Sequence, residues 1–428
     1  MRGSYNLLVS TLTFGWCFSI WTLYAFAGLG WQSQWHLSAT ELSILLASPI
    51  FSGALMRLPA GFLIDRFCPK RIWQLALLMQ TPPLWLLASA QSYVDHLMLG
   101  LWLGVAGVSF TVGSKIAIQN VHPNNAAISL GIFGIGNAGA IISLLLISYH
   151  TTLGLTMPLL YKSLAVLNLI VLLFFSMFST KNSTSPSTER IALKGHTEPA
   201  EKNNPINLWT EPRIWRFSLY YYFVFGCFLA LMLWLPHYYM SAYQLDSGSA
   251  LAFTLFFVTT SSLVRGLGGW LSARYGGRNV SWRVFWNNLV CLFFLSYPPT
   301  ELTISGIEHQ VNLRIEVGIW LFTALIFVIG IAQGLGRASV YSLLYQYYPK
   351  QFGQASGLVS AAGAVGGFTL PVLFGISQDL VGIYSACFMV LYGVLACCMM
   401  LMFLANRKEQ FQRELAKARA DNFLMEDK

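Results

Sequence analysis

Charged residues are scarce in this sequence. Asp, Glu, Lys and Arg make up 10% of its 428 residues, whereas hydrophobic residues make up 55%. Because soluble domains carry about 25% charged residues, this chain does not have enough charge to cover a surface in water. Apolar runs of about 20 residues, the length that spans a bilayer as a helix, recur along the chain, and the mean hydropathy is +0.57. The composition predicts an all-α polytopic membrane protein surrounded by a lipid bilayer.

Signatures of catalysis and of cofactor binding are also missing. The seven cysteines show no metal-ligand spacing and mostly lie in apolar runs, which is typical of buried thiols. A G-x-G-x-x-G match from Gly134 to Gly139 lies within an apolar run, without the strand and the acidic residue that a dinucleotide site requires. No P-loop or zinc-protease motif occurs. We therefore expect a protein that is not an enzyme and that holds no cofactor or metal.

The net charge of +9 is explained by where the cations lie. Lys and Arg gather after the second, sixth and eighth expected helices and in the C-terminal tail, whereas Asp and Glu gather in the loops of the opposite side. By the positive-inside rule, this asymmetry places both termini in the cytoplasm. The basicity is thus topological, and nucleic acid is not an expected partner. We expect a monomeric, multi-pass protein of the cell inner (cytoplasmic) membrane.

The chain divides into six apolar helices, a polar segment and six more helices. Residues 179–213 are rich in Ser, Thr, Asn and Pro, a composition that cannot bury enough apolar surface to order itself. We expect a six-helix bundle over 1–178, a cytoplasmic linker over 179–213, a second six-helix bundle over 214–405 and a cytoplasmic tail over 406–428. The twelve helices are expected at about 6–29, 41–64, 72–90, 96–120, 127–148, 159–178, 214–238, 250–271, 282–296, 317–344, 355–376 and 384–404.

The second and eighth expected helices carry similar stretches, FSGALMRLPAGFLIDR and SSLVRGLGGWLSARYGG. Aligning them pairs Arg57 with Arg265, 208 positions later, and Gly61 with Gly269. Two similar halves of six helices each are the major facilitator arrangement. The sequence therefore predicts that fold, with one intramembrane arginine at matching places in the two halves.

Arg57 and Arg265 are expected to bind an anion. An unpaired charge in the bilayer costs at least ~2.5–3.5 kcal/mol, and no Asp or Glu lies securely inside an expected helix to pair with them. Their partners are then carbonyl groups, water or a mobile anion, and two guanidinium forks suit a small flat oxyanion. A purely structural arginine pair in a water-filled cavity is the alternative interpretation.

The fifth and eleventh expected helices also resemble each other, with SLGIFGIGNAGAII and SGLVSAAGAVGGFTLP. Small residues allow helices to approach closely in lipid, so their glycines serve helix packing alone, close approach at a moving interface, or direct contact with a small ligand. Asn137 lies on the same face and is predicted to orient the anion; bridging two helices is its alternative role. The predicted packing or gating glycines are Gly134, Gly136, Gly139, Gly363, Gly366 and Gly367.

Three further residues are candidates for the transport route. Tyr221, near the start of the seventh helix, is a candidate for the wall of the site, with ordinary aromatic packing as its alternative. Lys115 and Arg337 lie in the fourth and tenth helices. Each either snorkels toward the cytoplasmic edge or lines the pathway, where it would take part in coupling.

These stretches resemble the nitrate/nitrite porter family of the major facilitator superfamily over nearly the whole chain. The resemblance is carried by GALMRLPAG, SLGIFGIGNAGA, YYFVFGCFLALMLWLPHYY, SSLVRGLGGWLS and GLVSAAGAVGGFTLPVLFG. It implies that Arg57 and Arg265 clamp the substrate, that Asn137 donates a hydrogen bond to it, and that Tyr221 belongs to an aromatic wall.

Departures from the family pattern bear on coupling. Lys115 is unexpected in the fourth helix, and Arg337 and Ser342 stand where proton-coupled members often carry lysines. With no evident membrane carboxylate to carry a proton, exchange of nitrate for nitrite by alternating access is the simplest mechanism, because an unpaired arginine pair is reluctant to reorient empty. Proton-coupled uptake, transport of another small or organic anion, and a non-transporting anion sensor are the alternatives.

Overall fold

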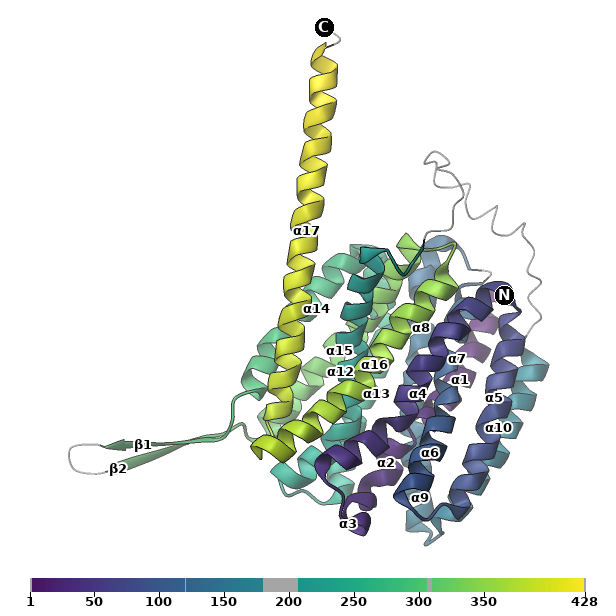
Figure 1. Cartoon of the computed structure of the whole chain (residues 1–428), viewed down its shortest axis with the longest axis vertical. Coiled ribbons are helices and arrows are strands. Elements are labelled where there is room, and N and C mark those ends of the chain that lie inside the picture. Colours follow the sequence, from purple (N-terminus) through teal and green to yellow (C-terminus); the bar gives the residue numbers. More distant parts are fainter. Residues whose placement is uncertain (1, 120, 180–206, 306–309, 427–428) are drawn as a thin grey trace.

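The computed structural model of this chain describes residues 2–119, 121–179, 207–305 and 310–426. Most of the expected linker, residues 180–206, lies outside the described residues. The described helices form one bundle, from which the last helix and a two-stranded hairpin project (Figure 1).

The first six spans consist of one or two helical segments each, and a short helix, α3 (Trp31–Trp35), lies between the first two spans. In chain order, the spans are α1 (Arg2–Trp21) with α2 (Tyr24–Ala27), α4 (Ala39–Arg66), α5 (Pro69–Leu86), α6 (Tyr93–Leu103) with α7 (Val108–Ile118), α8 (Ala126–Gly134) with α9 (Gly139–Thr152), and α10 (Met157–Phe178).

The last six spans are single helices. They are α12 (Pro212–Ala242), α13 (Ser247–Tyr275), α14 (Gly277–Leu295), α15 (Ile319–Tyr347), α16 (Phe352–Val381) and α17 (Ala386–Glu426). The prediction of a twelve-helix, all-α membrane protein is confirmed, with helix ends shifted by a few residues. Ten of the spans in the described ranges are long and apolar enough to cross a membrane by composition alone. The other two, α5 and α14, have a larger share of charged and amide side chains for their length than these ten spans have.

Two features at the ends of the bundle go beyond the twelve expected spans. An antiparallel hairpin of β1 (Thr300–Ser305) and β2 (Gln310–Ile315) occupies what was expected to be a plain loop. The expected tail after residue 405 continues α17 as helix to Glu426, since neither Gly nor Pro interrupts it. We call the end of the bundle that bears β1 and β2 the hairpin end, and the opposite end, beyond which α17 projects, the tail end (Figure 1).

Side chains cap three helices where they begin at the hairpin end. Ser38 and Glu41 form a capping box at α4, and Ser92 and Asp95 form one at α6. The Asp246 carboxylate caps α13. Such caps satisfy main-chain N–H groups that have no partner within the helix. They define where these spans start, although the spans themselves are apolar.

Burial distinguishes central from peripheral helices. The apolar windows of α1 and α12 are 78% and 89% buried, whereas those of α10 and α17 are each 33% buried and face outward. The two halves meet along two helix pairs, α4 with α16 and α8 with α13, which we call the α4–α16 seam and the α8–α13 seam. The candidate site lies between these seams.

Candidate functional site

Arg57, Arg265 and Arg337 form a layer of buried cations, called the arginine layer below. Each stands 18 residues after the first residue of its helix, α4, α13 or α15. Because all three helices run from the hairpin end to the tail end, equal spacing gives the arginines similar depth in the bundle. They are 0%, 1% and 0% exposed, respectively. The structure brings together the two arginines that the sequence paired and a third that was open to two interpretations.

Arg57 is held by main-chain oxygens from both halves. Its Nε donates to Gly107 O at 2.8 Å, and its Nη1 donates to Ser360 O of α16 at 2.9 Å. The guanidinium carbon lies 4.4 Å from the ring centre of Trp21, a cation–π distance. One side chain therefore links the first half to the second across the arginine layer.

Two spans of the first half change their helical geometry beside the layer. A 3-10 turn over Gly104–Gly107 separates α6 from α7, and another over Ile135–Ala138 separates α8 from α9. A 3-10 turn in the middle of a helix alters the regular hydrogen-bond ladder and often marks a functional hinge. Here the first turn supplies the Gly107 carbonyl to Arg57, and the second carries Asn137.

Asn137 lies between Arg265 and Arg337. We orient its amide with Oδ1 toward the arginines, because the opposite orientation would aim its NH₂ group at two other donors. Oδ1 then accepts from Arg265 Nη1 at 2.9 Å and from Arg337 Nη1 at 2.5 Å. Asn137 thus bridges two helices, as one interpretation of the sequence had it, while its donation to an anion stays a prediction.

Aromatic rings surround the layer. The Phe110 ring centre lies 5.7 Å from the guanidinium carbon of Arg57 and 5.0 Å from that of Arg265. Tyr221 is fully buried and stacks on Phe225, with ring centres 5.2 Å apart. Its hydroxyl has no hydrogen-bond partner among the described residues. Phe110 was missed by the sequence analysis, since a phenylalanine in an apolar run carries no signal of its own.

Lys115 lies outside the layer, at the tail end. Its Nζ is 3.1 Å from Asp65 Oδ1, and Asp65 Oδ2 accepts from Gln354 N at 3.0 Å. Asp65, at the end of α4, therefore ties both α7 and the start of α16 to that end. Among the described residues, no carboxylate forms an ion pair with a layer arginine.

Asp379 makes the corresponding contact at the hairpin end. It lies near the end of α16 and accepts from Ala39 N at 3.2 Å and from Thr40 N at 3.0 Å, at the start of α4. Since Asp65 accepts from the start of α16, each helix of the α4–α16 seam carries a carboxylate that caps its partner. The seam is therefore closed at both ends.

The six predicted glycines have two different surroundings. A Cβ atom at Gly134 would lie 2.0 Å from Arg265 Nε, so the missing side chain makes room for that arginine. The other five pack on helices of their own half, and Gly367 also approaches Ile50 of α4 across the α4–α16 seam. Gly136 and Gly139 pack on α1, and Gly363, Gly366 and Gly367 pack on α12.

Gly61 and Gly269, the pair that the sequence alignment matched, lie where the main chains of the two halves approach closely. A Cβ at Gly61 would lie 2.8 Å from Gly353 O, and a Cβ at Gly269 would lie 2.6 Å from Ala127 O. These crossings lie in the α4–α16 seam and the α8–α13 seam, about one turn from Arg57 and Arg265 toward the tail end.

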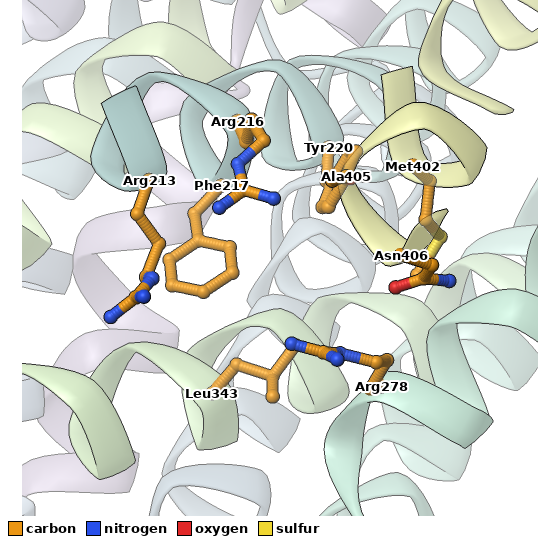
Figure 2. Close-up of a pocket in the computed structure, with 9 residues that line it drawn as sticks. All are labelled: Arg213, Arg216, Phe217, Tyr220, Arg278, Leu343, Met402, Ala405 and Asn406. Carbon is orange, nitrogen blue, oxygen red and sulfur yellow. The ribbon is translucent and has the colours of Figure 1, made fainter. Parts of the chain in front are cut away.

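Two cavities lie away from the arginine layer. Figure 2 shows the one at the tail end, where Arg213, Arg216 and Arg278 surround about 20 Å³, room for about one water molecule. The other is an open groove of about 710 Å³ at the hairpin end, lined by residues that include Tyr238 and Tyr384. No layer residue lines either of these two cavities.

Comparison with known proteins gives concordant matches. Residues 9–307 match the profile of the Major Facilitator Superfamily. The probable nitrate/nitrite antiporter NarK1 of Thermus thermophilus is 33% identical over 94% of this chain and 91% of that protein. The nitrite extrusion protein of Bacillus subtilis is 26% identical over 84% of this chain and 83% of that protein.

A solved structure is similar in fold. The human organic anion transporter MFSD10 superposes with a TM-score of 0.70 over 94% of this chain and 99% of that chain, at 14% identity. At this identity the similarity concerns the fold. Together with the profile match, it shows that the chain belongs to the Major Facilitator Superfamily. The relatives place it among the nitrate/nitrite porters of that superfamily.

Proposed function

We propose that this Major Facilitator Superfamily protein carries nitrate and nitrite across the membrane by alternating access, exchanging one anion for the other. The observation that carries the proposal is the arginine layer: three buried cations with no carboxylate partner among the described residues. The names of the relatives support nitrate and nitrite as the anions.

Arg57 and Arg265 neutralise the anion in this proposal. The buried Arg265 Nε and Tyr221 Oη have no hydrogen-bond partner in the described part of the chain, so they are donors that an anion oxygen can use. Donation from a guanidinium to an oxyanion is charge-assisted and therefore strong. The aromatic rings beside the arginines exclude water, which strengthens the electrostatic attraction further.

Exchange follows from the cost of moving uncompensated charge. A carrier with an empty site must reorient with all three layer cations unneutralised in a low-dielectric interior, where each charge is expensive. A bound anion offsets part of this cost. Reorientation is therefore faster with nitrate or nitrite bound than with the site empty, which couples inward movement of one anion to outward movement of the other.

The proposed organisation is that of the sequence analysis. Residues 1–178 and 214–405 form the two halves that move against each other, joined by a cytoplasmic linker over 179–213. The protein is a monomer of the inner membrane. Its basic loops lie at the tail end, so the tail end and both termini face the cytoplasm.

Uptake by purified protein in liposomes tests this function. Labelled nitrate is added outside, with nitrite, chloride, an organic anion or no anion trapped inside, for the wild type and for Arg57→Lys. Among these conditions we expect uptake only with internal nitrite, and its loss in Arg57→Lys because lysine cannot form the guanidinium fork.

Three other outcomes would change the proposal. Nitrate uptake driven by a pH gradient, without an internal anion, would retain the substrate and refute exchange. Nitrate uptake supported only by an internal organic anion would retain nitrate as a substrate and refute nitrite as its exchange partner, and no nitrate uptake under any condition would refute nitrate as the substrate. Binding of nitrate without any flux would make the protein a sensor rather than a transporter.

A further inference from the structure

Arg337 differs from the other two layer arginines in how many of its guanidinium nitrogens form hydrogen bonds within the protein. We infer that Arg337 is a positioning residue: it holds the amide oxygen of Asn137 and thereby aims Arg265 at the anion. This inference rests on the proposed function. For Arg337 the sequence allowed two interpretations, snorkelling toward the cytoplasmic edge or lining the pathway, and positioning is a third role.

Every guanidinium nitrogen of Arg337 already has a partner. Nη2 donates to Ser261 O and Ser261 Oγ, both at 2.7 Å, and Nε donates to Gln333 O at 3.2 Å. Nη1 donates to Asn137 Oδ1 at 2.5 Å, and the guanidinium carbon lies 3.8 Å from the ring centre of Phe228. A group fixed on all sides in this way is suited to holding a neighbour rather than to binding a ligand that comes and goes.

Arg265 shows the opposite pattern. Its Nη1 shares the Asn137 oxygen at 2.9 Å, but its buried Nε has no partner in the described part of the chain. The Nε lies against the bare backbone of Gly134, where a side chain would block it. Arg265 therefore retains donor capacity for an anion.

Asn137 connects these two arginines. Its oxygen accepts one hydrogen bond from each, so Arg265, Asn137 and Arg337 form a chain whose far end is anchored at Ser261. Removing Arg337 leaves the amide free to turn, because one of its two fixed donors is lost. Arg265 then loses the partner that sets its orientation.

A double-mutant cycle tests this chain. Nitrate–nitrite exchange in liposomes is measured for wild type, Asn137→Leu, Arg337→Met and the double variant, with KM and kcat determined for each. We expect each single variant to raise KM by about tenfold to a hundredfold, the value of a charge-assisted hydrogen bond. The double variant should show no higher KM than Asn137→Leu, because both changes break the same link. Arg283→Met, which removes an exposed cation from α14, serves as the matched control and should leave KM unchanged.

Independent effects would overturn the inference. If the KM increases multiply in the double variant, Arg337 acts on the anion or on stability without Asn137. If Arg337→Met fails to fold, Ser261→Ala replaces it in the same cycle, since it loosens Arg337 from the other side. A wild-type protein without nitrate or nitrite flux would refute the proposed function, whereas a working wild type with multiplicative effects would refute only the positioning role.

Discussion

A methyl group at position 269 should favour separation of the two halves at the tail end. In Gly269→Ala, the new Cβ would lie 2.6 Å from Ala127 O and 3.0 Å from the Cα of Gly131. Both are main-chain atoms of the first half, so no side chain can move aside to relieve the contact. The α8–α13 seam must widen by about an ångström to restore an ordinary contact distance.

The free-energy cost of this widening is that of adding a methyl group to a well-packed interface. Extra methyl groups in well-packed interiors cost about 1–3 kcal/mol. The penalty applies only while the seam is closed, since the methyl group is relieved when the halves part. The equilibrium between closed and opened tail end therefore shifts by about 5- to 150-fold toward opening.

Hydrogen exchange followed by mass spectrometry measures this shift. We expect faster exchange in the tail-end parts of α8 and α13 for Gly269→Ala, together with altered exchange transport. Gly393→Ala is the matched control, because a Cβ at Gly393 in α17 meets nothing within 4 Å. Wild-type protection and wild-type transport in Gly269→Ala would show that the close crossing does not limit opening.

Three further predictions concern single carboxylate or amide positions. Asn137→Asp places a carboxylate between Arg265 and Arg337; we expect at least about tenfold weaker nitrate binding by calorimetry and a higher Tm, because the site then contains its own anion. Unchanged binding would contradict the bridging geometry. Asp379→Ala removes the acceptor of Ala39 N and Thr40 N, so amides at the start of α4 should exchange faster while those at the start of α16 stay protected; equal loss at both ends would show that the two caps are not independent. Hydrogen bonds from Ser249 lower the pKa of the Asp246 carboxyl. A carboxyl whose pKa is lower in the folded state stabilises that state at pH values above its unfolded pKa, and this stabilisation is lost as the pH falls through the folded pKa. The Tm of Asp246→Ala should therefore lie below that of the wild type at pH 7, and the difference should disappear in acid. A deficit that is constant with pH would refute the ionic origin of this cap.

The composition and charge pattern alone predicted most of the fold. Twelve helices follow from apolar runs of bilayer length, because a spanning segment must satisfy its own main-chain groups and therefore becomes a helix. The repeated arginines also predicted that two distant helices contribute to one site. An unpaired charge in an apolar helix is costly wherever it lies, and its repetition at Arg57 and Arg265 required no knowledge of packing.

Only the tertiary structure decided which residues share the site with those arginines. Lys115 and Arg337 look alike in the sequence, as single cations inside apolar helices. Lys115 pairs with Asp65, whose place beside α7 depends on how α4 packs, whereas Arg337 joins Asn137. Phe110 and the reciprocal caps of Asp65 and Asp379 likewise depend on contacts between distant segments. Hydropathy and spacing specify how a segment lies in the membrane, but the facing of side chains between helices is set by close packing, which a one-dimensional pattern does not contain.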